Sequence, residues 1–146
     1  MPPEPHLTLI ARTIQLSVAP VFLLTAIGTM LAVLTGRLNR IVDRSRILEE
    51  HKASLPTKDE DEIHTELSTQ SRRSKWINVA ITLGTICALL ICSMIAAMFV
   101  GVFLSLDLSD VVALLFVTAM LAFIGALLAF LGEIFIAVRA LRIGMK

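Results

Sequence analysis

Charge is scarce in this sequence and is missing altogether from three long runs. Only 17% of the 146 residues are charged, whereas 56% are hydrophobic, a balance that excludes an ordinary soluble domain. The runs without Asp, Glu, Lys or Arg cover residues 13–36, 76–106 and 111–132. Each exceeds the ~18 residues that indicate a membrane-spanning helix, because a helix rises about 1.5 Å per residue and the hydrocarbon core is about 30 Å thick.

The apolar runs are continuous and lack the alternation of a lipid-facing β-strand, which excludes a membrane barrel. We therefore expect an all-α integral membrane protein, with one membrane domain over residues 1–146 and three transmembrane helices over about 13–36, 77–104 and 111–138. Pro20 lies in the first run. Because proline has no amide hydrogen and clashes with the preceding turn, we expect a kink there.

Residues that could form disulfides, metal sites or catalytic sites are also few. The two cysteines, Cys87 and Cys92, are five residues apart and so face different sides of one helix, which rules out a local disulfide. The three histidines show no metal spacing, and there is no nucleophile with a base and no phosphate-binding loop. We therefore predict no catalytic residues, no metal and no cofactor. With a net charge of +1, nucleic acid is not an expected partner.

The basic residues are distributed unevenly between the segments that join the apolar runs. Nine of them lie in residues 37–75, none lies between the second and third runs, and three follow the third run. The positive-inside rule then places residues 37–75 and the C-terminus in the cytoplasm, with the N-terminus outside.

Residues 37–75 are predicted to form a cytoplasmic helical hairpin. The first helix has no breaker before about Lys52, and Thr57 with Glu60 forms a capping-box pattern that would start a second helix leading into the second span. A partly disordered polar loop is the alternative, because only Ile63 and Leu67 give the second arm an apolar stripe.

The first run and its basic extension resemble a known family. The residues concerned are APVFLL at 19–24, IG at 27–28 and VLTGRLNRIVDRSR at 33–46. They are similar to the bacterial DUF2721 family of small three-helix membrane proteins, which has no assigned function. The resemblance implies a location in the bacterial cytoplasmic (inner) membrane and brings no activity with it.

Glu133 is the most informative single residue. It follows an uncharged run of 22 residues and shares a helical face with alanines, and such a face usually packs against protein. We expect a structural ion pair with Arg37 or Arg40 at the same membrane depth. An ion-binding or proton-relay role and snorkelling to the interface are the alternatives.

Arg37, Arg40 and Arg44 share one helical face just beyond the first run. Arginines near a bilayer surface attract anionic lipid headgroups, so we predict a headgroup-binding face. The alternative is that the three residues only determine topology.

Small residues spaced at about one helical turn occur in every span. We expect helix packing at Gly28, Ala32 and Gly36, at Gly84 and Ala88, and at Ala126 and Ala129, because small side chains let helix backbones approach closely in lipid. These faces exceed what one three-helix bundle needs, which predicts a homo-oligomer or a membrane-protein partner. We therefore expect a non-enzymatic, self-associating or accessory membrane subunit, with a small homo-oligomeric ion channel or conduit as the alternative.

Overall fold

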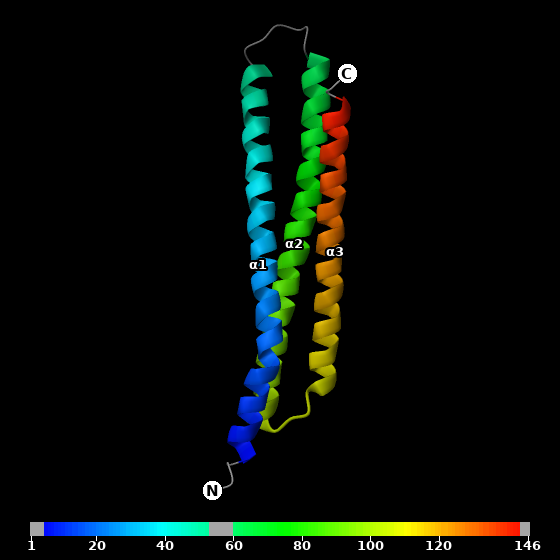
Figure 1. Cartoon of the computed structure of the whole chain (residues 1–146). Helices are drawn as coiled ribbons and strands as arrows, with labels where there is room; N and C mark the ends of the chain where they lie inside the picture. Colours follow the sequence, from blue (N-terminus) through cyan, green and yellow to red (C-terminus); the bar gives the residue numbers. More distant parts are fainter. Residues whose placement is uncertain (1–4, 53–59, 144–146) are drawn as a thin grey trace. The chain divides into compact units, whose positions relative to one another are not determined.

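Three long helices make up the described chain. The computed structural model describes residues 5–52 and 60–143. These contain α1 (Pro5–Lys52), α2 (Glu60–Leu104) and α3 (Ser109–Ile143) (Figure 1). The all-α prediction is therefore confirmed for these residues. Each helix is also long and apolar enough to cross a membrane, over His6–Glu50, Ser71–Leu104 and Ser109–Arg139.

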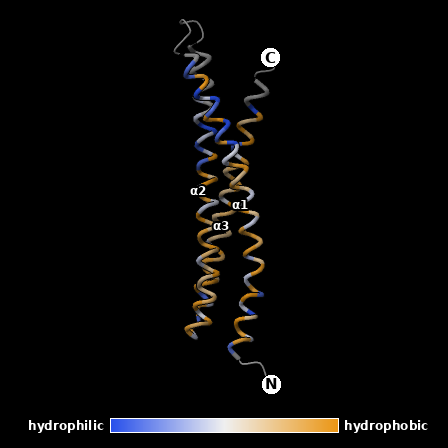
Figure 2. The backbone as a smooth tube through the Cα atoms, turned by 90° about the vertical axis from the view of Figure 1, so that its left-hand side faces the viewer, coloured by the Kyte–Doolittle hydropathy of each residue, from blue (hydrophilic) through white to orange (hydrophobic). Residues whose placement is uncertain are grey.

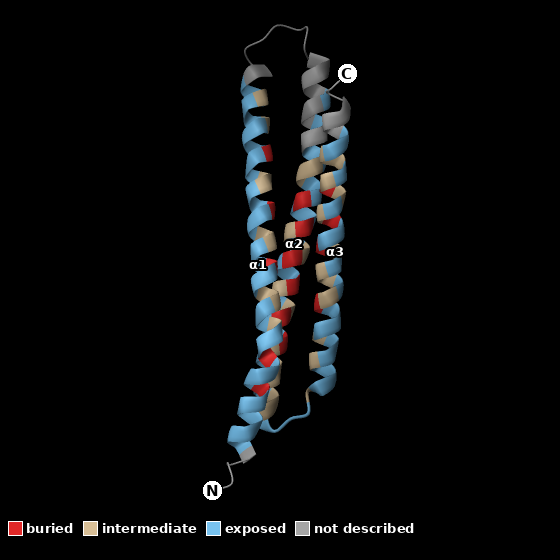
Figure 3. Cartoon of the chain, viewed as in Figure 1, coloured by how far each residue is buried: buried red, intermediate tan, exposed pale blue. Residues whose placement is uncertain are grey.

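Large apolar side chains cover the outer faces of the helices. Phe22 is 71% exposed, Phe103 88% and Leu114 68%. Figure 2 shows hydrophobic residues along most of each helix, and Figure 3 shows exposed positions along all three. In water each Å² of such surface would cost about 25 cal/mol, a penalty that hydrocarbon removes. The burial pattern is therefore that of a multi-pass membrane protein.

The ends of α1 and α2 bear on the predicted hairpin. α1 ends at Lys52, and α2 runs without a break from Glu60 into its apolar part. Residues 53–59, with the predicted cap at Thr57, lie outside the described residues, so the hairpin stays a prediction. Pro20 lies within α1, which is helical on both sides of it, and its predicted kink is likewise untested.

The packing groups the chain into two compact units, and every helix contributes to both. Unit 1 comprises Met1–Met30 and Leu83–Ile124, and unit 2 comprises Leu31–Thr82 and Gly125–Lys146. Each unit is described separately below.

Buried residues recur along each helix at intervals of three and four. In α2 the buried series is Ile77, Ala80, Gly84, Cys87, Ile91 and Met94. In α1 the fully or nearly buried Ile27, Leu34 and Ile41 are seven residues apart, as are Ala119, Ala126 and Glu133 in α3. A repeat of seven is the spacing at which core positions recur along one face of a helix. Glu133 therefore occupies a core position of α3.

In unit 1, α2 ends in a Schellman motif. The amide of Leu106 donates to the carbonyl of Gly101 at 2.9 Å, and the amide of Ser105 donates to that of Val102 at 3.4 Å. A Cβ atom on Gly101 would stand 3.1 Å from the Leu106 carbonyl oxygen, so the missing side chain leaves room for the turn. Ser105 has a φ of 52°, in the left-handed region that favours glycine.

The start of α3 is fixed by Asp107. Its Oδ1 atom accepts hydrogen bonds from the hydroxyl and the amide of Ser109, the pattern of an Asx-turn. These two bonds, the hydroxyl first, lower the pKa of the Asp107 carboxyl. The carbonyl of Leu108 then accepts the first helical bond from the amide of Val112 at 2.9 Å.

Ser105→Gly is expected to stabilise the fold. Glycine adopts the left-handed conformation without the Cβ clash that serine carries, and we expect a gain of about 0.5–1 kcal/mol. Helical circular dichroism during denaturant unfolding in detergent measures the change. Ser105→Ala keeps the Cβ atom and is the matched control, so equal gains from both variants would contradict the backbone explanation.

Candidate functional site

A fully buried carboxylate lies in unit 2. Glu133 of α3 has no exposed surface. Ala126 and Ala129, one and two turns earlier, are also buried, so the helix presents a face of small side chains with one acid at its end. A charge in apolar surroundings costs several kcal/mol unless it is paired and hydrogen-bonded. The position therefore requires a cationic partner.

Two arginines from two other helices supply the opposite charge. Nη1 of Arg37, on α1, donates to Oε2 of Glu133 at 2.6 Å. Arg73, on α2, donates to Oε1 from Nη2 at 2.9 Å and from Nε at 3.3 Å. Both carboxylate oxygens are therefore bonded to cations. We call Arg37, Arg73 and Glu133 the triad, and it links segments of all three helices within unit 2.

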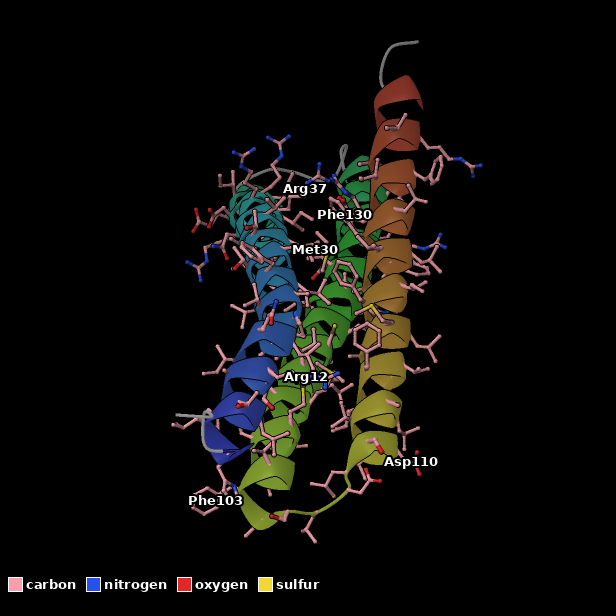
Figure 4. The ribbon with its side chains drawn as sticks, turned by 60° about the horizontal axis from the view of Figure 1, so that its bottom comes forward. Arg12, Met30, Arg37, Phe103, Asp110 and Phe130 are labelled. Atoms are coloured by element: carbon pink, nitrogen blue, oxygen red, sulfur yellow. The ribbon has the colours of Figure 1, made fainter. Side chains whose placement is uncertain are left out.

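Two aromatic residues lie at or next to the triad. The guanidinium carbon of Arg37 lies 5.3 Å from the ring centre of Phe130, a cation–π distance, and Figure 4 shows the two residues side by side. A Cβ atom on Gly132 would stand 3.5 Å from the ring of Trp76. Because Gly132 has no side chain, the indole packs directly on the α3 backbone at the residue before Glu133.

The triad carries one net positive charge, because two guanidinium groups share one carboxylate. The side chain of Arg37 is 40% exposed and that of Arg73 is 27% exposed. The carboxylate is therefore buried while each cation keeps an open side. Among the described residues, no group of three His, Cys, Asp or Glu could hold a metal ion.

The structure brings together only some of the residues singled out in the sequence. Glu133 and Arg37 meet, whereas Arg40 is exposed and has no ion pair with Glu133 within the described chain. Arg44 is also exposed. Arg73 was not predicted, although it stands four residues before Ile77 and so extends the buried series of α2 by one position.

The predicted packing residues differ in their surroundings. Gly84, Ala126 and Ala129 are buried and Ala88 is half-buried. Gly28, Ala32 and Gly36 are exposed on α1, and a Cβ atom added at either glycine would meet nothing within 4 Å. Space is therefore open beside both glycines, and the predicted role of this second group between subunits stays a prediction.

Hydroxyl groups in the apolar helices bond to their own backbone. Six threonines and one serine donate to the carbonyl four residues earlier: Thr13, Ser17, Thr25, Thr29, Thr35, Thr82 and Thr118. Such bonds satisfy the hydroxyl donor without water or a neighbouring helix.

Glu133 and Arg37 should be energetically coupled. We expect Glu133→Leu combined with Arg37→Leu to destabilise less than the sum of the single changes, by about 1–2 kcal/mol, because each single change leaves a charge with too few partners. This magnitude is below that of a fully buried pair because Arg37 is partly exposed. Unfolding in detergent, followed by circular dichroism, provides the cycle.

The control cycle pairs Glu133→Leu with Arg40→Leu. Arg40 is on the same helix, three residues away, and should be additive with Glu133 within about 0.5 kcal/mol. Equal coupling in both cycles would mean that the contact with Arg37 has no specific energy.

Comparison with known protein families shows what the chain is similar to. A family described as "Protein of unknown function (DUF2721)" matches residues 17–143, which include the whole triad. No curated protein and no solved structure matches the chain significantly.

Proposed function

The chain belongs to the DUF2721 family of proteins of unknown function, and we propose that it is a non-enzymatic membrane subunit that self-associates. The observation that carries the proposal is the triad. Glu133 is buried and both its oxygens are hydrogen-bonded to arginines of α1 and α2. The carboxylate therefore serves to join three helices and has no free oxygen for catalysis. The proposed location is the bacterial cytoplasmic membrane.

The same arrangement argues against the alternative of a cation conduit. A cation at Glu133 would meet two guanidinium groups within hydrogen-bonding distance of the carboxylate, and like charges repel strongly in surroundings of low dielectric constant. Four hydroxyls of the apolar helices, those of Thr25, Thr29, Thr82 and Thr118, use their donor on their own backbone, which leaves no free hydroxyl donor at these positions for a pore. Both features favour a packed scaffold.

Self-association is supported by the exposed small residues of α1. Gly28, Ala32 and Gly36 leave the backbone open on the outside of the helix. Lipid chains gain little from such a surface, whereas a second helix can approach it closely and make extensive van der Waals contact. A second copy of this chain is the partner that we propose.

Gly28→Ile should weaken the oligomer before it unfolds the protomer. The β-branched side chain would hold a second backbone away from α1, and we expect about a tenfold loss of association. Native mass spectrometry of the protein released from lipid nanodiscs measures the stoichiometry. Ala19→Ile is the matched control, because Ala19 is exposed on α1 and lies nine residues, or half a helical turn in angle, from Gly28.

Two results would contradict this prediction. A wild-type protein that stays monomeric at every lipid ratio would sink the self-association proposal and favour attachment to a different membrane protein. Equal effects of Gly28→Ile and Ala19→Ile would show that the small residue at position 28 has no special part in the contact.

We propose that residues 37–75 form a helical hairpin in the cytoplasm and that the turn before α3 lies outside. The support is the concentration of nine basic residues in 37–75 and their absence between the second and third apolar runs. In a background with Cys87→Ala and Cys92→Ala, Ser109→Cys should react with an impermeant maleimide in intact cells. Ser71→Cys should react only after the membrane is opened, and the opposite pattern would reverse the orientation.

A further inference from the structure

We propose that Arg37 and Arg73, held in place by Glu133, form a binding site for a phosphate group. In the proposed membrane location, on which this inference rests, the phosphate belongs to the headgroup of an anionic phospholipid. The first argument is charge. Two guanidinium groups share one buried carboxylate, which leaves one positive charge to be balanced, and a phosphodiester carries one negative charge.

The second argument is the number of hydrogen-bond donors left over. A guanidinium group has five N–H donors. Arg37 uses only Nη1 on Glu133, and Arg73 uses Nε and Nη2. The donors on Nε and Nη2 of Arg37 and on Nη1 of Arg73 make no hydrogen bond to any backbone group or side chain that the structure describes, a set that leaves out the side chains of residues 60–64, 66, 67, 69 and 70. Two neighbouring N–H donors of one guanidinium group can bind two oxygens of the same phosphate.

The third argument is that the two cations are held in position before a ligand arrives. Each arginine is anchored by the carboxylate, and the ring of Phe130 supports Arg37 from one side. A ligand therefore does not have to immobilise two long side chains, a step that would otherwise weaken its binding. The partial exposure of both arginines leaves a side open to the ligand.

The position of the triad along the chain points to a lipid as the source of the phosphate. Arg37 immediately follows the first uncharged run, Glu133 immediately follows the third, and Arg73 stands three residues before the second begins. All three residues therefore mark the polar end of an apolar helix, which is where headgroup phosphates meet a membrane protein. Trp76, at the start of the second run, is of the residue type enriched at this interface.

This site differs from a general positive surface. Arg40, Arg44 and Arg46 are exposed on later turns of α1, and they would attract any anionic membrane through a field that salt screens. The triad instead offers a fixed pair of guanidinium groups beside a buried acid. Removing Arg37 should therefore weaken binding far more than removing an equal charge elsewhere on α1.

The test is a titration of the purified full chain in neutral detergent, with native mass spectrometry counting bound lipids. One arm adds phosphatidylglycerol, a second adds phosphatidylcholine, and a third adds inorganic phosphate as a competitor. Arg37→Gln makes the triad neutral while Arg73 still pairs with Glu133. Arg46→Gln removes the same charge from the same helix and is the matched control.

We expect phosphatidylglycerol to bind the wild-type chain about tenfold more tightly than phosphatidylcholine, because both lipids carry a phosphodiester but the positively charged triad repels the choline cation of the second. Arg37→Gln should abolish this preference, and Arg46→Gln should keep it. Arg37→Lys keeps the charge but lacks the forked donors, so it should retain part of the preference for phosphatidylglycerol. Such partial retention would show that the loss in Arg37→Gln reflects a local contact and not a damaged fold. Competition by inorganic phosphate at similar concentrations would assign the site to dissolved phosphate, and lack of competition assigns it to lipid.

The inference is overturned if Arg37→Gln and Arg46→Gln lose the preference equally, or if the wild-type chain shows neither a lipid preference nor phosphate binding. These outcomes are distinct from failure of the proposed function. If the protein can be washed from membranes without detergent, the membrane assignment itself is wrong. If it stays in the membrane as an oligomer but shows no headgroup preference, only the phosphate site is contradicted.

Discussion

A single buried negative charge sets the arrangement of the three helices in unit 2. Glu133 has no exposed surface, and in a protein without water around its core such a group is tolerated only where cations meet it. One arginine on each of two other helices must therefore reach the same point. A slide of either helix by one turn, about 5.4 Å, would take its guanidinium out of hydrogen-bonding range. The triad thus fixes the axial register of three surfaces that apolar packing alone would specify weakly.

Unit 1 has no comparable constraint among its described residues. Its buried polar groups, Thr13 and Ser17, donate to carbonyls of their own helix, so they add no bond between helices. Contact there depends on the fit of side chains such as Ile27, Ile91 and Met94, all of which are buried. Packing of this kind in lipid is held by van der Waals contact and tolerates small displacements more readily than an ion pair does. The two units therefore depend on different forces.

Much of the fold follows from the sequence, because an absence of charge over 18 residues has few structural explanations. The three apolar runs predict the three helices, and the lack of a breaker after residue 36 predicts that α1 continues to Lys52. The face shared by Glu133 and its alanines indicates that the acid points toward protein. Helical angles within one element are enough for these inferences.

The partners of Glu133 were harder to predict, because a contact between helices depends on their rotation and register. Arg37 and Arg40 were both in range by depth, and they differ by three residues, or about 60° around the helix. Arg73 is one of nine basic residues in 37–75, and its charge alone does not distinguish it from the others. Its spacing of four from Ile77 and seven from Ala80 would have placed it on the buried line of α2. The repeat of seven is therefore a better guide to this partner than charge counting.

The contact between Trp76 and Gly132 makes the triad optically visible. Trp76 is the chain's single tryptophan, and its ring lies against the α3 backbone beside the buried carboxylate. Indole emission depends on the polarity and rigidity of its surroundings. Separation of α2 from α3 in unit 2 would therefore change the fluorescence of the unlabelled protein, while loosening confined to unit 1 would leave it unaltered.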